Sequence, residues 1–253
     1  MKTYSTMNID SAPESRHNHL LDALPAAEWA RWRPRLEQVD LALGQVLSEE
    51  GHTPTFAFFP TTAVVSLIST TQDGDSAEFA VVGNDGVVGI SLVMGGHSMP
   101  GNAVVQSAGR AWRMRAQAIR DEAAQAGPAL ELLLRYTQSL MAQVAETAAC
   151  NRHHTVDQLL CRRLLLGLDR APNAALVMTH ELLANLLGVR RESVTAAAMR
   201  LAQAGAIRYR RGHIDVLDRA WLEQGAASRE RQSRPQPQQR WVRLPLNSLA
   251  LAA

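Results

Sequence analysis

Apolar and polar positions divide the chain into three stretches with different periods. Apolar side chains recur at three- and four-residue steps over residues 20–38, which predicts a short helical entry. Short apolar runs separated by glycine turns follow over about 39–118 and predict strands. Beyond Gly127 the helical period returns and continues to about residue 204. This order predicts an α+β protein whose strands and helices lie in separate parts.

Seven strand candidates fill the central stretch. They are Val39–Leu43, Thr55–Phe59, Val64–Thr70, Ala77–Val82, Val87–Leu92, Ala103–Ala108 and Ala111–Arg115. Asp73-Gly74, Asn84-Asp85-Gly86 and Gly95-Gly96 mark turns between them. Strands at such regular spacing are typical of a β-sandwich or a jelly-roll barrel. The spacing alone leaves other β architectures open.

A long helix is predicted from Pro128 to about Cys150. Seven apolar residues are expected on one side of it: Leu130, Leu133, Leu134, Leu140, Met141, Val144 and Ala148. A stripe of this length predicts a homodimer formed through the 128–150 helix, with packing on the preceding strands as the alternative. Residues 149–154, which include Cys150, His153 and His154, are predicted to form a hinge before a helix over Val156–Asp169.

Two short helices and a hairpin are predicted between Thr179 and Leu217. Thr179 is the expected N-cap of a helix that ends at Gly188. A second helix follows over about Arg190–Ala204, with four residues facing inward: Val194, Ala197, Ala198 and Leu201. Alternating apolar residues then flank a basic tip over 210–213, which is typical of a hairpin. This layout predicts a winged helix-turn-helix, a motif that places one helix in the major groove of DNA.

The side chains expected to face outward carry the chemistry for reading DNA. Arginine pairs bidentately with guanine, and glutamate accepts a hydrogen bond from the amino group of cytosine. We therefore expect Arg191, Glu192 and Thr195 to read bases, and five residues to hold phosphates: Arg190, Arg208, Arg210, Arg211 and His213. Thr179 and Ser193 complete the candidate DNA-binding set. The alternative is a small helical hairpin with a solvated charged face.

Charge is distributed unevenly along the chain. The net charge of +2 combines −6 over residues 1–150 with +8 over residues 151–253. Lys2 is the only lysine, so nearly all of the positive charge is arginine. A basic C-terminal part beside an acidic N-terminal part favours nucleic-acid binding at the C-terminal end.

The C-terminal segment resembles the DNA-binding domain of the Crp/Fnr family of transcription regulators. The matching residues are Thr179, Glu181, Leu182, Ala184, Gly188, Arg191, Glu192, Val194, Leu201, Gly205, Ile207 and Gly212-His213-Ile214. The resemblance implies a β-roll of the cyclic-nucleotide-binding type over the strands, and base contacts by Arg191 and Glu192. At the position of a second base-reading arginine of the family this chain has Ala196. We therefore expect a half-site that differs from that of the best-known members.

The resemblance also identifies where a ligand would bind. Nucleotide-binding members use a Gly-Glu pair for the ribose and an Arg-Ser pair for the phosphate. Gly89 is retained, but Ile90 replaces the glutamate and Gly101-Asn102 replace the Arg-Ser pair. We therefore predict no binding of cAMP or cGMP in the family manner. The candidate ligand loop is Gly89, Ile90, Ser91, Gly101 and Asn102, with no ligand identified and neither cofactor nor metal expected.

The remaining features narrow the function. The motifs of P-loop enzymes, serine hydrolases and zinc proteases are absent from the sequence, so no enzyme is predicted. No apolar run approaches the ~18 residues of a membrane span, and residues 1–25 lack a signal-peptide core, so a cytoplasmic protein is expected.

The expected partners are palindromic double-stranded DNA and RNA polymerase. The alternative function is a small-molecule sensor or a protein-interaction module with weak or effector-dependent DNA binding. The predicted domains are a disordered 1–19, a β-roll over 20–120, the dimer helix over 121–151, the winged helix-turn-helix over 152–223 and a disordered tail over 224–253.

Overall fold

The N-terminal part of the described chain is helical before the first strand. The computed structural model describes residues 17–95, 98–170, 176–210 and 212–227, and most of the two segments predicted to be disordered lie outside these ranges. Helices α1 (His19–Asp22) and α2 (Ala26–Trp32) lead into a 3₁₀ turn, η1 (Arg33–Arg35). The predicted helical entry is confirmed as far as Arg35, and a strand begins at Leu36.

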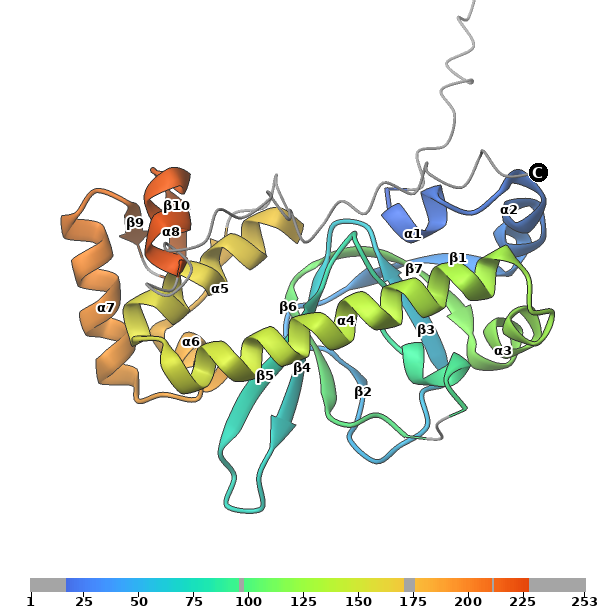
Figure 1. Cartoon of the computed structure of the whole chain (residues 1–253), viewed down its shortest axis with the longest axis horizontal. Coiled ribbons are helices and arrows are strands. Elements are labelled where there is room, and N and C mark those ends of the chain that lie inside the picture. Colours follow the sequence, from blue (N-terminus) through green and yellow to red (C-terminus); the bar gives the residue numbers. More distant parts are fainter. Residues whose placement is uncertain (1–16, 96–97, 171–175, 211, 228–253) are drawn as a thin grey trace, which may run out of the picture.

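Seven antiparallel strands form two sheets that pack face to face (Figure 1). They are β1 (Leu36–Leu41), β2 (Val46–Ser48), β3 (Phe56–Pro60), β4 (Val64–Thr70), β5 (Ser76–Val82), β6 (Asn102–Ser107) and β7 (Gly109–Arg115). The strand orders are β1-β7-β3 and β2-β6-β4-β5. Phe58 and Ala111 from the first sheet meet Val65 and Val105 from the second in the buried core. The predicted class of two-sheet β architecture is therefore confirmed.

The strand predictions differ from the structure at three places, the first being β1, which begins three residues before the predicted start at Val39. The short strand β2 was not predicted. The predicted strand Val87–Leu92 is wrong, because Gly89 adopts a φ of 92° and a 3₁₀ helix, η2 (Ile90–Val93), follows it. Ile90 and Leu92 are buried in the core beside the N-terminal helices. A continuous apolar run fits a buried helical turn as well as a buried strand, and the glycine decides between them.

Two helices follow the sheets, and the second presents two different apolar faces. After α3 (Ala116–Ala124) comes α4 (Pro128–His153). Leu133, Leu140 and Val144 of α4 pack against the β-roll, whereas Leu134 and Met141 are 49% and 65% exposed. The prediction that these residues share one side is wrong, because the β-roll covers only part of the apolar stripe and leaves Leu134 and Met141, about 100° further round the helix, uncovered. Packing on the same chain accounts for the inner part of the stripe.

The C-terminal part is a separate cluster of helices with a small sheet. Its elements are α5 (Val156–Arg170), β8 (Leu176–Val177), α6 (His180–Leu187), α7 (Arg191–Gln203), β9 (Ile207–Arg210), β10 (His213–Val216) and α8 (Arg219–Ala226). The sheet order is β8-β10-β9. The predicted helices and hairpin are confirmed, while β8 and α8 were not predicted. The helix α8 extends three residues into the predicted tail.

The predicted hinge over 149–154 is wrong for most of its length. The helix α4 continues to His153, and only His154 and Thr155 separate it from α5. Cys150 is buried in the core of the C-terminal part. This burial favours extending the helix, because the last turns of α4 are then part of that core.

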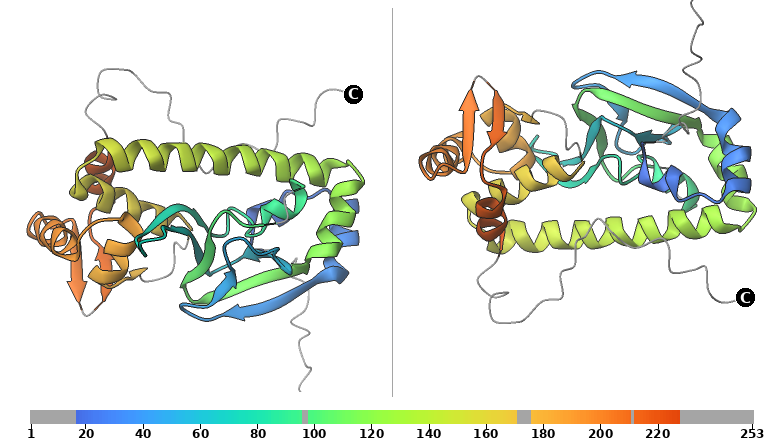
Figure 2. Two further views of the ribbon diagram at one scale, coloured as in Figure 1. Left: turned by 90° about the horizontal axis from the view of Figure 1, so that it is seen from below. Right: turned by 90° about the horizontal axis from the view of Figure 1, so that it is seen from above.

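The helix α4 spans the molecule and joins its two parts. The β-roll and the C-terminal part lie on the same side of α4, and no other described element covers its opposite side (Figure 2). The C-terminal part packs on the β4–β5 end of the β-roll, with α6 and α5 against β5 (Figure 1). Among the described residues, no helix is long and apolar enough to cross a bilayer.

Candidate nucleic-acid interface

The turn between α6 and α7 is built from local signals. The side-chain hydroxyl of Thr179 caps α6 by accepting a hydrogen bond from the backbone N–H of Leu182 at 3.1 Å. Gly188 ends α6 with a φ of 63°, a left-handed conformation that favours glycine. The backbone N–H of Val189 then donates to the carbonyl oxygen of Ala184 at 3.0 Å. Both the cap and the turn glycine were predicted, and they set where α7 begins.

The helix α7 has one buried and one exposed side, as predicted. Val194, Ala197, Ala198 and Leu201 are buried in the C-terminal core. Arg190, Arg191 and Glu192 at its N-terminal end are exposed, and Ser193 is half-buried. Further along, Ala196 is half-buried and presents only a methyl group. The charged side chains predicted to read DNA therefore lie together at the end of α7 that such helices insert into the groove.

Thr195 already uses its hydroxyl within the protein. The hydroxyl donates to the backbone carbonyl of Arg191 at 3.0 Å, and the Nδ1 atom of His180 lies 3.0 Å from Oγ1 of Thr195. Since the single hydroxyl proton goes to the carbonyl, His180 is the donor and its Nδ1 carries a proton. The His180 ring also stacks on Tyr209 of β9, with 4.3 Å between ring centroids. Base reading by Thr195 remains a prediction, and the structure gives it a second role in joining α6 to α7.

Sequence reasoning did not single out His180. Its hydrogen-bond partner Thr195 and its stacking partner Tyr209 follow 15 and 29 residues later, and no local spacing indicates either contact. The buried Nε2 atom of His180 has no hydrogen-bond partner among the described residues. Burial, followed by the nearby charge of Arg191, lowers the pKa of His180 from its ordinary value.

A pH-dependent stability of the C-terminal part follows from this lowered pKa. As the pH falls below about 6.5, the unfolded chain takes up a proton that the folded His180 resists, so the folded state loses stability. The variant His180→Asn keeps an N–H donor near Nδ1 but does not titrate. We expect its melting temperature to fall less than that of the wild type between pH 7 and pH 5.5. His153→Asn, at an exposed histidine, is the control. An equal dependence of the melting temperature on pH in the wild type and in His180→Asn would contradict the role assigned to His180.

The wing is a two-stranded hairpin with charged residues on one face. Arg208 and Arg210 of β9 are exposed, and Arg210 pairs with His213 of β10 in the antiparallel register. Asp215 lies opposite Arg208 and reduces the positive charge of this face. Arg211, which was predicted to contact phosphate, lies outside the described residues. The structure thus brings three of the four predicted wing residues together.

Arg200 at the far end of α7 is occupied by an ion pair. Its Nε atom lies 2.8 Å from Oδ2 of Asp157 in α5, and its second nitrogen approaches Oδ1 of the same carboxylate. This hydrogen bond raises the pKa of Arg200, although the pair is exposed and contributes little stability. Its main structural consequence is a polar link between α7 and α5.

The candidate ligand loop is filled by the protein itself. Ile90, in place of the family's glutamate, is only 7% exposed and packs into the core. A Cβ atom on Gly101 would lie 2.5 Å from the carbonyl oxygen of Ile68, so this position accepts no side chain. Ser91 and Asn102 also have partners within the chain: Met99 Sδ at 3.3 Å and the Glu50 N–H at 2.9 Å. None of these contacts provides a cation for a phosphate.

The two cysteines are buried thiols in the C-terminal core. Burial, with a contribution from Asp157, raises the pKa of Cys161 to about 11, so its thiol stays protonated near neutral pH. A protonated thiol is a poor nucleophile and a poor metal ligand. Across the described residues no group of three or more histidine, cysteine or carboxylate side chains is placed to hold a metal ion.

Comparisons with known proteins agree with this geometry. A model of the Crp-like helix-turn-helix domain matches residues 158–224, and a model of the cyclic nucleotide-binding domain matches residues 38–126. No curated protein matches the sequence.

Solved structures share the whole two-part arrangement at low identity. A putative Crp/Fnr-family transcriptional regulator from Eubacterium rectale has a TM-score of 0.66 and 17% identity, covering 84% of this chain and 99% of its own. FixK2 from Bradyrhizobium japonicum has a TM-score of 0.66 and 16% identity, covering 76% and 98%. A CRP/FNR-family regulator from Thermus thermophilus has a TM-score of 0.62 and 23% identity, covering 76% and 100%. These likenesses show a common fold.

The two domain models together span well over half of the chain, in the order found in the solved structures. The cyclic nucleotide-binding model falls on the β-roll, and the Crp-like model falls on the helix-turn-helix with its cap, turn glycine and exposed arginines. The chain therefore belongs to the Crp/Fnr family of transcription regulators.

Proposed function

We propose that the protein is a homodimeric, sequence-specific regulator of transcription that binds DNA without cAMP. The observation that carries the proposal is the exposed N-terminal end of α7, where Arg190, Arg191 and Glu192 project from a helix whose other side is fully packed. Arg191 and Glu192 are assigned to bases, and Arg190, Arg208 and Arg210 to phosphates.

The proposed dimer uses the outer apolar face of α4. We define this face as Leu134, Met141, Ala145 and Ala148, all of which are exposed. Their spacing of seven, four and three residues is the heptad pattern of a helix that pairs with a second copy. A two-fold axis along this face would present two recognition helices to an inverted repeat, whose half-sites lie about one turn of DNA apart.

Independence from cAMP is supported by the filled ligand loop. Binding a cyclic phosphate requires a cation or several converging donors. The buried Ile90 and the tightly packed Gly101 supply neither. We therefore expect no change in DNA affinity on adding cAMP or cGMP, and RNA polymerase is the natural partner of such a regulator once it is bound at a promoter.

The proposal is tested by selecting genomic DNA fragments with the purified protein at about 0.15 M salt, where non-specific binding is weak. The selection is run without ligand, and a parallel sample contains cAMP. Recovery of the same inverted repeat from both samples would support the proposal. Enrichment only with cAMP would contradict the ligand independence, and no enrichment in either sample would contradict sequence-specific binding.

A second candidate is a small-molecule sensor or protein-interaction module with weak or effector-dependent DNA binding. Two observations favour it: Ala196 has no hydrogen-bonding group, and the proton of the Thr195 hydroxyl is donated within the protein. Both reduce the number of side chains available for reading bases. An unsuccessful selection would therefore be followed by a screen for ligands that raise the melting temperature.

A substitution in the wing is expected to reduce the affinity for DNA of any sequence. Replacing Arg210 by alanine removes the side chain assigned to one phosphate, so binding should weaken on matched and scrambled duplexes alike. The slope of log K against log salt should decrease by about 0.9 for each phosphate that the variant no longer neutralises. Arg219→Ala is the matched control, because Arg219 is an exposed arginine of the same domain held by Asp169 and Glu223. An unchanged slope for Arg210→Ala would contradict the assignment of Arg210 to a phosphate.

A further inference from the structure

A buried polar cluster joins the β-roll to the C-terminal part. It consists of Ser66 on β4, Glu78 on β5, Gln106 on β6 and Arg163 on α5, and we call it the interdomain cluster. Arg163 and Glu78 are only 2% and 7% exposed, and Gln106 and Ser66 are buried with them. Val65, Leu67 and Val105 belong to the core between the sheets, so the alternation of side chains along β4 and β6 places Ser66 and Gln106 on the opposite face. They therefore form a polar patch that the C-terminal part covers.

Every member of the cluster has a partner in it. Arg163 meets Glu78 with two nitrogens, at 2.8 Å from Nε to Oε1 and 3.1 Å from Nη2 to Oε2. The same Nη2 donates to the side-chain oxygen of Gln106. Ser66 Oγ lies within hydrogen-bond distance of the Glu78 carboxylate and of Gln106. One arginine of α5 is thereby tied to three neighbouring strands.

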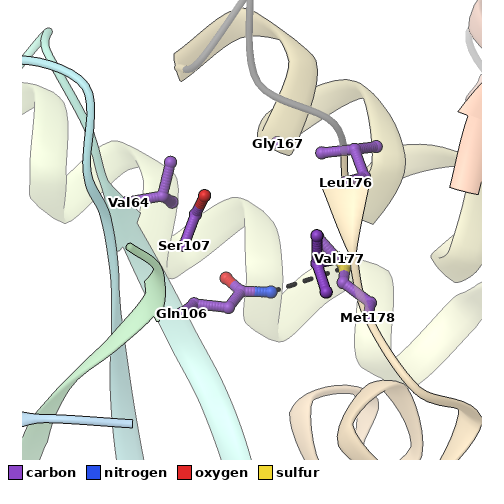
Figure 3. Close-up of a pocket in the computed structure, with 7 residues that line it drawn as sticks. All are labelled: Val64, Gln106, Ser107, Gly167, Leu176, Val177 and Met178. Atoms are coloured by element: carbon purple, nitrogen blue, oxygen red, sulfur yellow. Dashed lines mark hydrogen bonds between the residues drawn. The ribbon is translucent and has the colours of Figure 1, made fainter. Parts of the chain in front are cut away.

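The surroundings of the cluster are tightly packed. Gln106 Nε2 points toward the sulfur of Met178 at 3.4 Å, across the junction between the two parts (Figure 3). The cavity beside it, which Val64, Gly167 and Leu176 also line, has a volume of about 10 Å³ (Figure 3). Such a space holds at most one water molecule. Glu78 and Arg163 do not line this cavity, and their low exposure removes the charged pair from bulk solvent.

A second arginine on the same face of α5 attaches one end of this helix to the β-roll. Arg170 follows Arg163 by seven residues, and its Nη2 lies 3.2 Å from Oδ2 of Asp85. Its Nε donates to the carbonyl oxygen of Val81 at 3.0 Å. Gly83 permits this approach, since a Cβ there would lie 2.4 Å from Cβ of Arg170. Two separate attachments fix the direction of α5 as well as its position.

The energetics of the pair favour a role in orientation over one in stability. Burial raises the pKa of Glu78 and lowers the pKa of Arg163, so for each group desolvation outweighs the attraction of its partner. Buried pairs of this kind add little net stability, but removing one partner leaves an uncompensated buried charge. In the observed docking of α5 the two charges face each other, although Nε and Nη1 of Arg163 have no hydrogen-bond partner among the described residues. The pair therefore disfavours dockings of α5 that would separate the two charges.

The orientation of α5 determines that of the recognition helix. Leu160 and Leu164 of α5 share a core with Val194 and Leu201 of α7, and the Asp157–Arg200 ion pair adds a polar link. In this docked arrangement Arg190, Arg191 and Glu192 are exposed. The docked state therefore leaves the DNA-reading surface accessible.

We propose that Glu78 and Arg163 are positioning residues that hold α7 in a DNA-competent orientation in the absence of any effector. This inference rests on the proposed DNA-binding function. The Glu78–Arg163 contact would then fix the orientation of α7, in place of a bound ligand. The two recognition helices of a dimer must keep a fixed separation, so the cluster should affect binding to two half-sites and not to one.

The experiment compares an inverted-repeat duplex with a duplex that carries one half-site. Glu78→Gln and Arg163→Met should each weaken binding to the inverted repeat by about tenfold or more, and change half-site binding by less than about twofold. The double variant should be less impaired than the sum of the two single variants, because it leaves no unpaired buried charge. Glu37→Gln is the control, since it removes the exposed Glu37–Arg113 pair within the β-roll.

Two results would overturn the proposal. A parallel loss on both duplexes would mean that the variants damage the domain itself. A gain in affinity for the inverted repeat would mean that the docked state is inhibitory.

A measurement without DNA separates this proposal from the function on which it rests. Labels are placed on the exposed residues Gln38 and Gln203 by the variants Gln38→Cys and Gln203→Cys, and the distance distribution is measured in mixed dimers with one labelled subunit. We expect a narrow distribution in the otherwise unchanged protein and a broader one with Glu78→Gln. Equal widths would overturn the proposal even if DNA binding is confirmed. Failure of the DNA selection alone would leave this result to decide the positioning role.

Discussion

Replacing Arg191 by alanine is expected to weaken binding to the selected inverted repeat by roughly 1–3 kcal/mol for each half-site, or about 5- to 150-fold. Arg191 is the first residue of α7, it is exposed, and no ion pair occupies its guanidinium among the described contacts. A bidentate pair with guanine supplies two directed hydrogen bonds that alanine cannot replace. Because each dimer carries two copies, the loss is expected at both half-sites.

The role of Arg191 is tested by measuring how strongly the variant prefers each base pair of the half-site. The variant should lose its preference at one base pair of each half-site and keep it at the others. Arg190→Ala and Arg219→Ala are the comparison variants, one assigned to phosphate and one held in ion pairs away from the recognition helix. Competition against duplexes changed one base pair at a time would show the pattern. If Arg191→Ala and Arg190→Ala weakened all duplexes equally, the assignment of Arg191 to a base would be wrong.

Replacing Met141 by glutamate is expected to convert dimers into monomers. Met141 is 65% exposed at the middle of the outer apolar face of α4, and Leu134 lies two turns before it on the same side. In a two-fold pair the new carboxylates would approach each other and displace apolar contact area. The linked binding of two half-sites would be lost, and with it roughly 10²- to 10⁴-fold of the affinity for the inverted repeat.

Sedimentation or light scattering gives the oligomeric state of the Met141 variant, and DNA titration gives the consequence. Half-site binding should stay near that of the wild type, because Met141 is not one of the residues that form the helix-turn-helix core. Gln125→Glu introduces the same charge at an exposed position beyond the end of α3 and serves as control. A Met141→Glu protein that remained dimeric would show that the subunits associate through another surface.

The helix-turn-helix could be predicted because its signals are local. A threonine cap, a left-handed glycine and four inward apolar residues act within one or two helical turns, so nearby sequence fixes them. The wing followed from alternation over four residues on each strand. The prediction of a strand over Val87–Leu92 was wrong because no local signal decides there. A continuous apolar run has neither a helical nor a strand period, and the burial of Ile90 and Leu92 favoured a 3₁₀ turn.

The contacts that position these elements could not be predicted, because they join distant residues. Glu78 and Arg163 are 85 residues apart, and neither position differs in the sequence from an ordinary exposed charge. The role of His180 depends on a helix and a strand that fold onto it from later in the chain.

The covered side of α4 was also not predictable. The apolar period of this helix was correct, but the period does not indicate which apolar side chains the β-roll will cover. The α+β class and the helix-turn-helix were predictable from the amino-acid order, since each depends on side chains at short spacing, and the roles assigned to Arg191, Glu192 and Ile90 stay predictions. The exposed face of α4 and the docking of α5 were not predictable in this way, because both depend on surfaces that meet after the chain has folded.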